Sequence, residues 1–65
     1  MRIGDEMSNP TKEEIRRARI DAKLTQKQAG ELLGYSAGAW MKWEYGERPM
    51  RRKLFQVFLK ETTEL

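Results

Sequence analysis

The residues of this chain that can bind a charged partner are concentrated in its second half. Residues 37–60 contain six Lys and Arg against two Asp and Glu, whereas residues 1–36 contain seven basic and six acidic residues. The whole chain carries a net charge of +3. Such a basic stretch can be an ordinary solvated surface, or it can bind the phosphates of a nucleic acid. Which of these two interpretations applies depends on the elements that carry the basic residues.

Few residues of the chain suit catalysis or metal binding. Its 65 residues include no Cys and no His, so disulfides, thiolate ligands and the commonest general base and metal ligand are all missing. No nucleophile–base pair, phosphate-binding loop or metal-ligand spacing is present. We therefore expect no enzymatic activity, no cofactor and no small-molecule ligand. No apolar run approaches the roughly 18 residues of a membrane span, and the start lacks a signal-peptide core, so we expect a cytoplasmic protein.

Residues 37–45 are the segment with the most specific potential chemistry. Trp40 and Trp43 are three apart, which places both on the inward side of a helix. The outward positions of that helix are Ala37, Gly38, Met41, Lys42 and Tyr45. Lys42 is the only charged donor among them. It can donate to guanine O6 or N7 in a major groove, contact a phosphate, or remain solvated.

Capping signals and apolar spacing predict the elements that hold this segment. Two capping boxes are present, Thr11 with Glu14 and Thr25 with Gln28. Ser36 can cap a third helix, and Pro49 can begin a fourth. We predict helices over residues 12–22, 26–33, 37–45 and 50–60. Since no segment alternates like a strand, the fold class is all-α, a compact four-helix domain over residues 11–60 with an arm over residues 1–10 and a tail over residues 61–65.

The helical period also predicts a core. The expected inward residues are Ile15, Ala18, Ala22, Ala29, Leu32, Leu33, Tyr35, Trp40, Trp43, Met50, Leu54, Val57 and Phe58. Phe55 and Leu59 lie off the core side of the last helix, and Ile20 lies off the core side of the first. A 65-residue monomer has little core to cover all of these, so we expect the three to form a homodimer interface. The alternative is one broad helix face packed within a single small core.

The second and third expected helices are joined by a very short connection. Gly34, Tyr35 and Ser36 alone separate them, which is typical of a helix-turn-helix unit. Glycine inside a helix costs roughly 1 kcal/mol against Ala, so Gly30 indicates a close approach of the two helices. Gly34 can supply the positive φ that the turn needs. The alternative is an ordinary corner between two helices of a bundle.

Over residues 11–59 the chain resembles the Xre/Cro family of small phage and bacterial DNA-binding regulators. The matching stretch, residues 24–49, reads LTQKQAGELLGYSAGAWMKWEYGERP. The resemblance implies a lambda-repressor-like helix-turn-helix domain and a buried ion pair between Arg19 and Glu44. Within that family, the chain looks most like short members that repress phage operons, including operons with anti-CRISPR genes.

The resemblance also implies how the domain meets double-stranded DNA. It assigns base contacts to Ala37, Gly38, Met41 and Lys42. It assigns a phosphate contact to Gln26, and by position and charge we add Lys27, Tyr45, Arg48, Arg51 and Arg52. Ala37 and Gly38 cannot hydrogen-bond a base through a side chain, so they would instead allow close approach of the helix.

The function that these observations predict is transcriptional repression. The protein would bind a palindromic operator as a dimer, repress its own operon, and associate with the nucleoid of a bacterial cell. The alternative is an antitoxin or other protein-interaction module with secondary DNA binding. The short tail over residues 61–65 argues against the toxin-neutralising segment that many antitoxins carry.

Overall fold

The computed structural model describes residues 9–64, which form four α-helices and no strand. Helix α2 spans Lys12–Asp21, α3 spans Gln26–Leu32, α4 spans Ala37–Tyr45 and α5 spans Arg52–Thr63. The predicted all-α class is confirmed for this part of the chain. Residues 1–8 of the expected arm, and the last residue of the tail, lie outside it. No helix in this part has both the length and the apolar character that crossing a bilayer requires.

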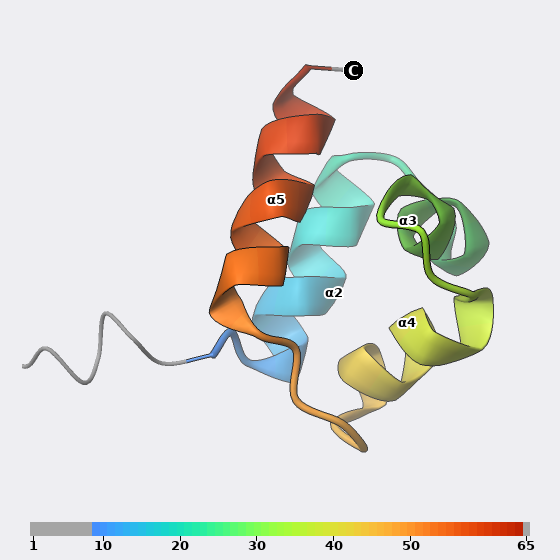
Figure 1. Ribbon diagram of the computed structural model, residues 1–65, viewed down its shortest axis with the longest axis vertical. Helices are drawn as coiled ribbons and strands as arrows, with labels where there is room; N and C mark the ends of the chain where they lie inside the picture. Colours follow the sequence, from blue (N-terminus) through green and yellow to red (C-terminus); the bar gives the residue numbers. More distant parts are fainter. Residues whose placement is uncertain (1–8, 65) are drawn as a thin grey trace, which may run out of the picture.

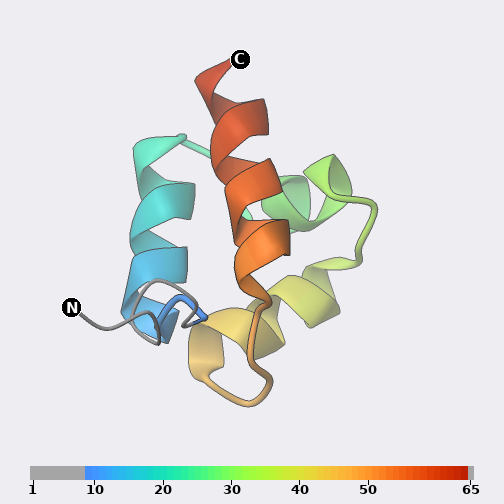
Figure 2. The same cartoon turned by 60° about the vertical axis from the view of Figure 1, so that its left-hand side comes forward.

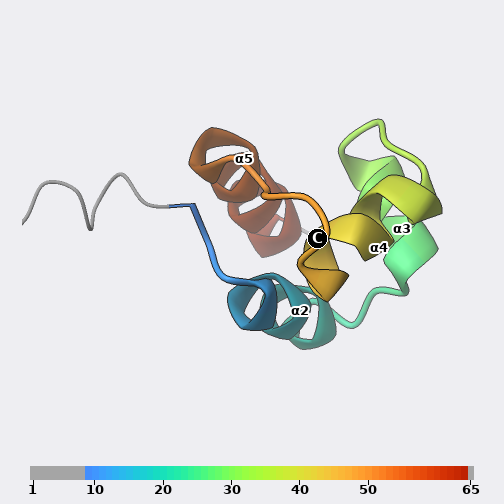
Figure 3. The ribbon, with the colours of Figure 1, turned by 90° about the horizontal axis from the view of Figure 1, so that it is seen from below.

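Helices α2 and α5 lie side by side along the long direction of the molecule (Figure 1). Figure 2 shows the same pair after a turn about the vertical axis, again with neighbouring axes. Seen from below, in Figure 3, α3 and α4 lie together on one side of that pair. The helix-turn-helix unit, α3 and α4, therefore lies against the pair formed by α2 and α5.

Both predicted capping boxes are present. In the first, the Glu14 N–H donates to Thr11 Oγ1 over 3.1 Å, and the Thr11 N–H donates to Glu14 Oε1 over 2.8 Å. In the second, Thr25 and Gln28 make the equivalent bonds at 3.0 and 2.9 Å. These bonds satisfy N–H groups that have no partner within the helix. They explain why α2 and α3 begin at the predicted residues.

The α3–α4 turn depends on two glycines. A Cβ at Gly30 would lie 2.7 Å from the carbonyl oxygen of Ser36 and 3.0 Å from that of Tyr35, too close for any other residue without a backbone shift. Gly34 has φ +81°, a left-handed conformation that glycine adopts without strain. Ser36 then caps α4 by accepting the Ala39 N–H over 3.1 Å. The close approach of α3 to the start of α4 is therefore confirmed.

The core gathers around Trp40. Trp40, Phe58, Ile15 and Met50 are the largest fully buried side chains. The Trp40 ring lies 4.8 Å from that of Phe58 and 5.7 Å from that of Trp43, measured between centroids. Burying a side chain of this size contributes about 1.5–3 kcal/mol. Since α2, α4 and α5 all supply members, burial in the core fixes α4 against both supporting helices.

The prediction for the last helix is wrong at its start. The sequence predicts this helix over residues 50–60, with Pro49 next to its start. Instead α5 runs over Arg52–Thr63, so it begins two residues later and includes residues 61–63 of the expected tail. Met50 is fully buried ahead of the helix, and Arg51, with an extended backbone (ψ 142°), is the N-cap. Because Met50 is buried ahead of the helix, α5 begins further along the chain than predicted, and Pro49 lies in the connecting loop.

The inward side of α5 also differs from the prediction. Val57, expected in the core, is 47% exposed, whereas Phe55, expected off the core side, packs partly against it. The inward stripe therefore runs through Leu54, Phe55 and Phe58. Tyr35, also expected inside, is 44% exposed, although its ring meets the edge of the Trp43 ring at 5.1 Å.

Two residues that the sequence assigned to the arm are attached to the domain. Pro10 is buried, and the Asn9 side chain accepts the Arg52 N–H over 3.1 Å through its Oδ1. Arg51 makes no side-chain cap of its own. Asn9 therefore caps α5 from the other end of the chain.

Candidate nucleic-acid interface

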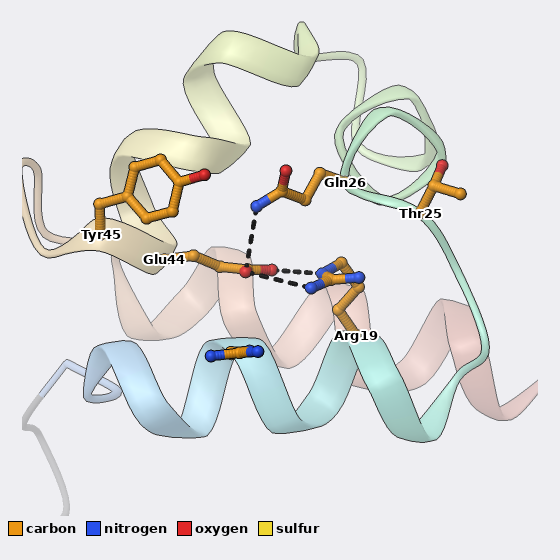
Figure 4. Close-up of a pocket in the computed structure, with 6 residues that line it drawn as sticks. Arg19, Thr25, Gln26, Glu44 and Tyr45 are labelled. Atoms are coloured by element: carbon orange, nitrogen blue, oxygen red, sulfur yellow. Dashed lines mark hydrogen bonds and ion pairs between the residues drawn. The ribbon is translucent and has the colours of Figure 1, made fainter.

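A buried carboxylate joins the three helices of the candidate interface. The Glu44 side chain in α4 is only 3% exposed. Arg19 of α2 donates to it from Nε over 2.5 Å and from Nη2 over 3.3 Å. Gln26 of α3 donates from Nε2 to Oε1 over 3.2 Å, and the Trp40 indole N–H donates to Oε2. Figure 4 shows Arg19 and Gln26 converging on Glu44. We call Glu44 with these three donors the Glu44 network.

Electrostatics keep Glu44 ionised. Burial raises the pKa of its carboxyl, but the hydrogen bonds from Arg19, Trp40 and Gln26 and the charge of Arg19 together outweigh burial, so the pKa lies below its ordinary value of 4.5. The Arg19 guanidinium also donates to the Leu24 carbonyl over 3.0 Å. The ion pair that the resemblance implied is thus present, and it ties the α2–α3 connection to α4.

The outward face of α4 differs from its inner side, where Glu44 is buried and hydrogen-bonded. It consists of Ala37, Gly38, Met41, Lys42 and Tyr45. Gly38, Lys42 and Tyr45 are exposed, and Ala37 and Met41 are partly buried. Lys42 takes part in no ion pair among residues 9–64. These positions are available to a partner, and none of the exposed three is needed for the core.

Space around Gly38 is open. A Cβ built there would have one neighbour within 4 Å, the Ser36 Oγ at 3.8 Å, which is ordinary van der Waals contact. Packing within the described chain therefore does not require glycine at this position. Its effect is to remove bulk from the first turn of α4, on the side that faces outward.

Three of the proposed phosphate-binding residues lie along neighbouring hollows. Gln26 and Tyr45 line a hollow of about 430 Å³, and the Tyr45 hydroxyl points toward the Gln26 amide (Figure 4). Tyr45 and Arg48 line a second hollow of about 450 Å³. The Gln26 side chain is already used once, as a donor to Glu44. The structure thus brings together residues from the start of α3 and the end of α4.

The other three candidates lie elsewhere. Lys27 is exposed, and its Nζ is 4.0 Å from Glu31, a weak surface pair. Arg51 is exposed just ahead of α5, and Arg52 is partly buried in its first turn. None of the three lines either hollow.

The sequence missed two members of this site in their structural roles. Trp40 was assigned to the core alone, yet its N–H binds Glu44; the spacing of four residues within one helix could have indicated this contact. Gln26 was assigned to DNA alone, and its bond to Glu44 spans 18 positions, so no local pattern indicates it. No group of three or more potential metal-ligating side chains occurs in the part of the chain that the structure describes.

Comparison with known proteins agrees with this geometry. A family model described as "Helix-turn-helix domain" matches residues 13–60. The match covers nearly all of α2, the whole α3–α4 unit and most of α5. No curated protein is significantly similar to the chain.

Proposed function

Because the chain belongs to the helix-turn-helix domain family, a family of DNA-binding regulators, we propose that it is a sequence-specific transcriptional repressor of the Xre/Cro type. The observation that carries this proposal is the division of α4 into two sides. Its inner side is fixed by Trp40, Trp43 and Glu44, all buried. Its outer side presents Gly38, Lys42 and Tyr45 to the surroundings. A rigidly held helix with a free outer face suits insertion into a major groove.

Base reading falls to the first half of that outer face and to Lys42. Lys42 donates to guanine O6 or N7, and Ala37 contacts a thymine methyl group. Met41 adds apolar contact, and Gly38 permits close approach. Since few of these groups form hydrogen bonds with bases, the shape and deformability of the DNA supply part of the specificity.

Affinity comes mainly from phosphate contacts. Gln26 and Tyr45 line one hollow together with residues of α2, and Arg48, past the end of α4, lines a neighbouring hollow with Tyr45. Lys27, Arg51 and Arg52 add positive charge on either side. Repression needs no catalysis, because occupancy of a promoter excludes the polymerase.

We propose further that the protein acts as a homodimer on a palindromic operator of its own operon, at the nucleoid. Exposed apolar side chains on α2 and α5 support the dimer: Ile20 is 48%, Val57 47% and Leu59 41% exposed. Phe55 is partly buried against the core, so it would contribute less of its side chain to the interface. A dimer in solution at tens of micromolar by light scattering is expected, and a monomer under those conditions would contradict this part.

The test of the function is selection from a random duplex library, followed by binding at several salt concentrations. We expect enrichment of one inverted repeat that binds at least about 1,000-fold more tightly than random duplex. Lys42→Ala should reduce that preference, whereas Arg51→Ala should weaken binding to all sequences alike. Absence of any enriched sequence would refute the repressor.

A further inference from the structure

Helix α2 carries a basic residue that neither the sequence analysis nor the family match assigns to DNA. We propose that Arg16 is a phosphate ligand, and that the DNA backbone crosses a groove between α2 and the end of α4. This inference rests on the proposed function, because the ligand is a phosphodiester of the operator.

Two adjoining hollows form this groove. The first, of about 430 Å³, is lined by Arg16, Arg19, Thr25, Gln26, Glu44 and Tyr45. The second, of about 320 Å³, is lined by Lys12, Glu13, Arg16, Glu44 and Tyr45. They share Arg16, Glu44 and Tyr45, so they are parts of one depression, which we call the α2 groove. Arg16 is the only basic residue common to both.

The charged side chains that line the α2 groove are Lys12, Arg16 and Arg19 against Glu13 and Glu44, a balance of one positive charge, and Arg16 is the only basic residue among them that lines both hollows. Arg19 and Glu44 neutralise each other through the contacts of the Glu44 network. Lys12 lines only the second hollow, and its Nζ lies toward the end of α4, 3.9 Å from where a Cβ on Gly46 would be. Arg16 is exposed and takes part in no ion pair among residues 9–64.

The neighbouring donors favour a phosphate over other acids. Gln26 and Tyr45 line the same hollow as Arg16 and bring an amide N–H and a phenol O–H from α3 and α4. A planar guanidinium can bind two phosphate oxygens at once, and neutral donors complete the oxygen set. Because Tyr45 also belongs to the outward face of α4, a strand whose bases meet that face would lead its backbone toward Arg16.

Arg17 provides a matched control one residue away. Its side chain lies on a different side of α2, pairs with Asp21 at 3.3 Å and lines a hollow with Phe55 and Leu59. Arg16→Gln and Arg17→Gln therefore make the same change of charge in the same helix. Only the first alters the α2 groove.

The experiment measures binding of both variants to the selected operator from about 50 to 200 mM salt. For Arg16→Gln we expect affinity to fall on the order of five- to tenfold and the slope of log K against log salt to drop by about one. Arg17→Gln should match the wild type in both; because Arg17 lies beside Phe55 and Leu59 of the proposed dimer interface, light scattering has to give the same mass for the two variants. Equal thermal unfolding of the two variants would show that the loss is not structural.

A scan with single neutral methylphosphonates on the operator identifies the phosphate. One position should weaken wild-type binding but leave Arg16→Gln unaffected. Inorganic phosphate at millimolar concentration should not compete, since the site is expected to require the polymer. If Arg16→Gln retains the wild-type slope while the wild type binds specifically, this inference alone is wrong. If the wild type shows no specific, salt-dependent binding, the proposed function fails as well.

Discussion

Gly30 and Gly38 both lie in helices of the same helix-turn-helix unit, but their surroundings differ. A Cβ at Gly30 would lie 2.7 Å from a backbone oxygen, whereas a Cβ at Gly38 would find one side-chain atom, at 3.8 Å. Glycine in a helix costs up to about 1 kcal/mol against Ala. The fold accounts for that cost at Gly30, because the two helices could not otherwise approach. At Gly38 the fold gives no such reason, and the close approach of DNA that we propose would supply one.

The same division extends along α4. On the inner side, Trp40 and Glu44 are buried and bonded to one another, and Glu44 also binds α2 and α3. On the outer side, Lys42 and Tyr45 are exposed. Substitutions on the inner side should therefore change stability, and those on the outer side should change DNA binding with little change in stability.

The largest expected effect is on the inner side, at the Glu44 network. Arg19→Ala or Glu44→Ala leaves one member of a buried pair without its partner, which costs about 3–5 kcal/mol of unfolding free energy. Urea denaturation of each variant measures the loss. Arg17→Ala is the control, since Arg17 and Asp21 are 78% and 65% exposed and their pair contributes less than about 1 kcal/mol. Equal losses in all three variants would show that the inner side is not special.

Gly30→Ala should have the next largest effect. The new methyl group would press on the carbonyl groups of Ser36 and Tyr35, and relief requires a shift of the α3–α4 turn. Overpacking of this kind costs about 1–3 kcal/mol. The thermal unfolding midpoint should fall accordingly. A midpoint equal to that of the wild type would mean that the helices can separate at no cost, and the comparison with Gly38 would lose its basis.

The parts of the fold that depend on local signals could be predicted from the sequence, and the parts that depend on contacts between distant residues could not. The starts of α2 and α3 could be read from Thr11 and Thr25, because each cap bonds within three residues. The start of α5 could not, since it depends on burial of Met50 and on a cap from Asn9, 43 positions away. Helical period placed Trp40 and Trp43 inside correctly, but Val57 incorrectly, because the direction of the core seen from α5 is set by packing.

The candidate site was predictable in part for the same reason. Period alone places Gly38 and Lys42 on the outer side of α4. The partnership of Arg19 with Glu44 came only from resemblance, and the bond from Gln26 to Glu44 came from neither. Which outer residues touch bases depends on a partner that the chain does not contain, so it stays a prediction.

Gly38→Ala separates stability from binding most sharply. Alanine should raise the unfolding free energy by up to about 1 kcal/mol, because it favours the helix and meets no obstacle. The same methyl group should hold α4 away from the base pairs and lower operator affinity by about tenfold, or ~1.4 kcal/mol. Calorimetry and a binding titration on one preparation check both signs. A variant that is more stable and binds equally well would show that the outer side does not approach DNA closely at this position.

The smallest expected effect is a pH dependence confined to the inner side. The pKa of Glu44 is lower in the folded protein than its ordinary 4.5, so the unfolded chain binds its proton first as pH falls. The corresponding stability is fully present above about pH 4.5 and is lost as pH drops through the folded pKa. Glu44→Gln keeps every other carboxylate, so the difference between its stability curve and that of the wild type isolates this residue. We expect the wild type to be the more stable above pH 5 and the two curves to converge at lower pH. Parallel curves over that range would mean that Glu44 titrates alike in both states, and that the Glu44 network does not hold its charge.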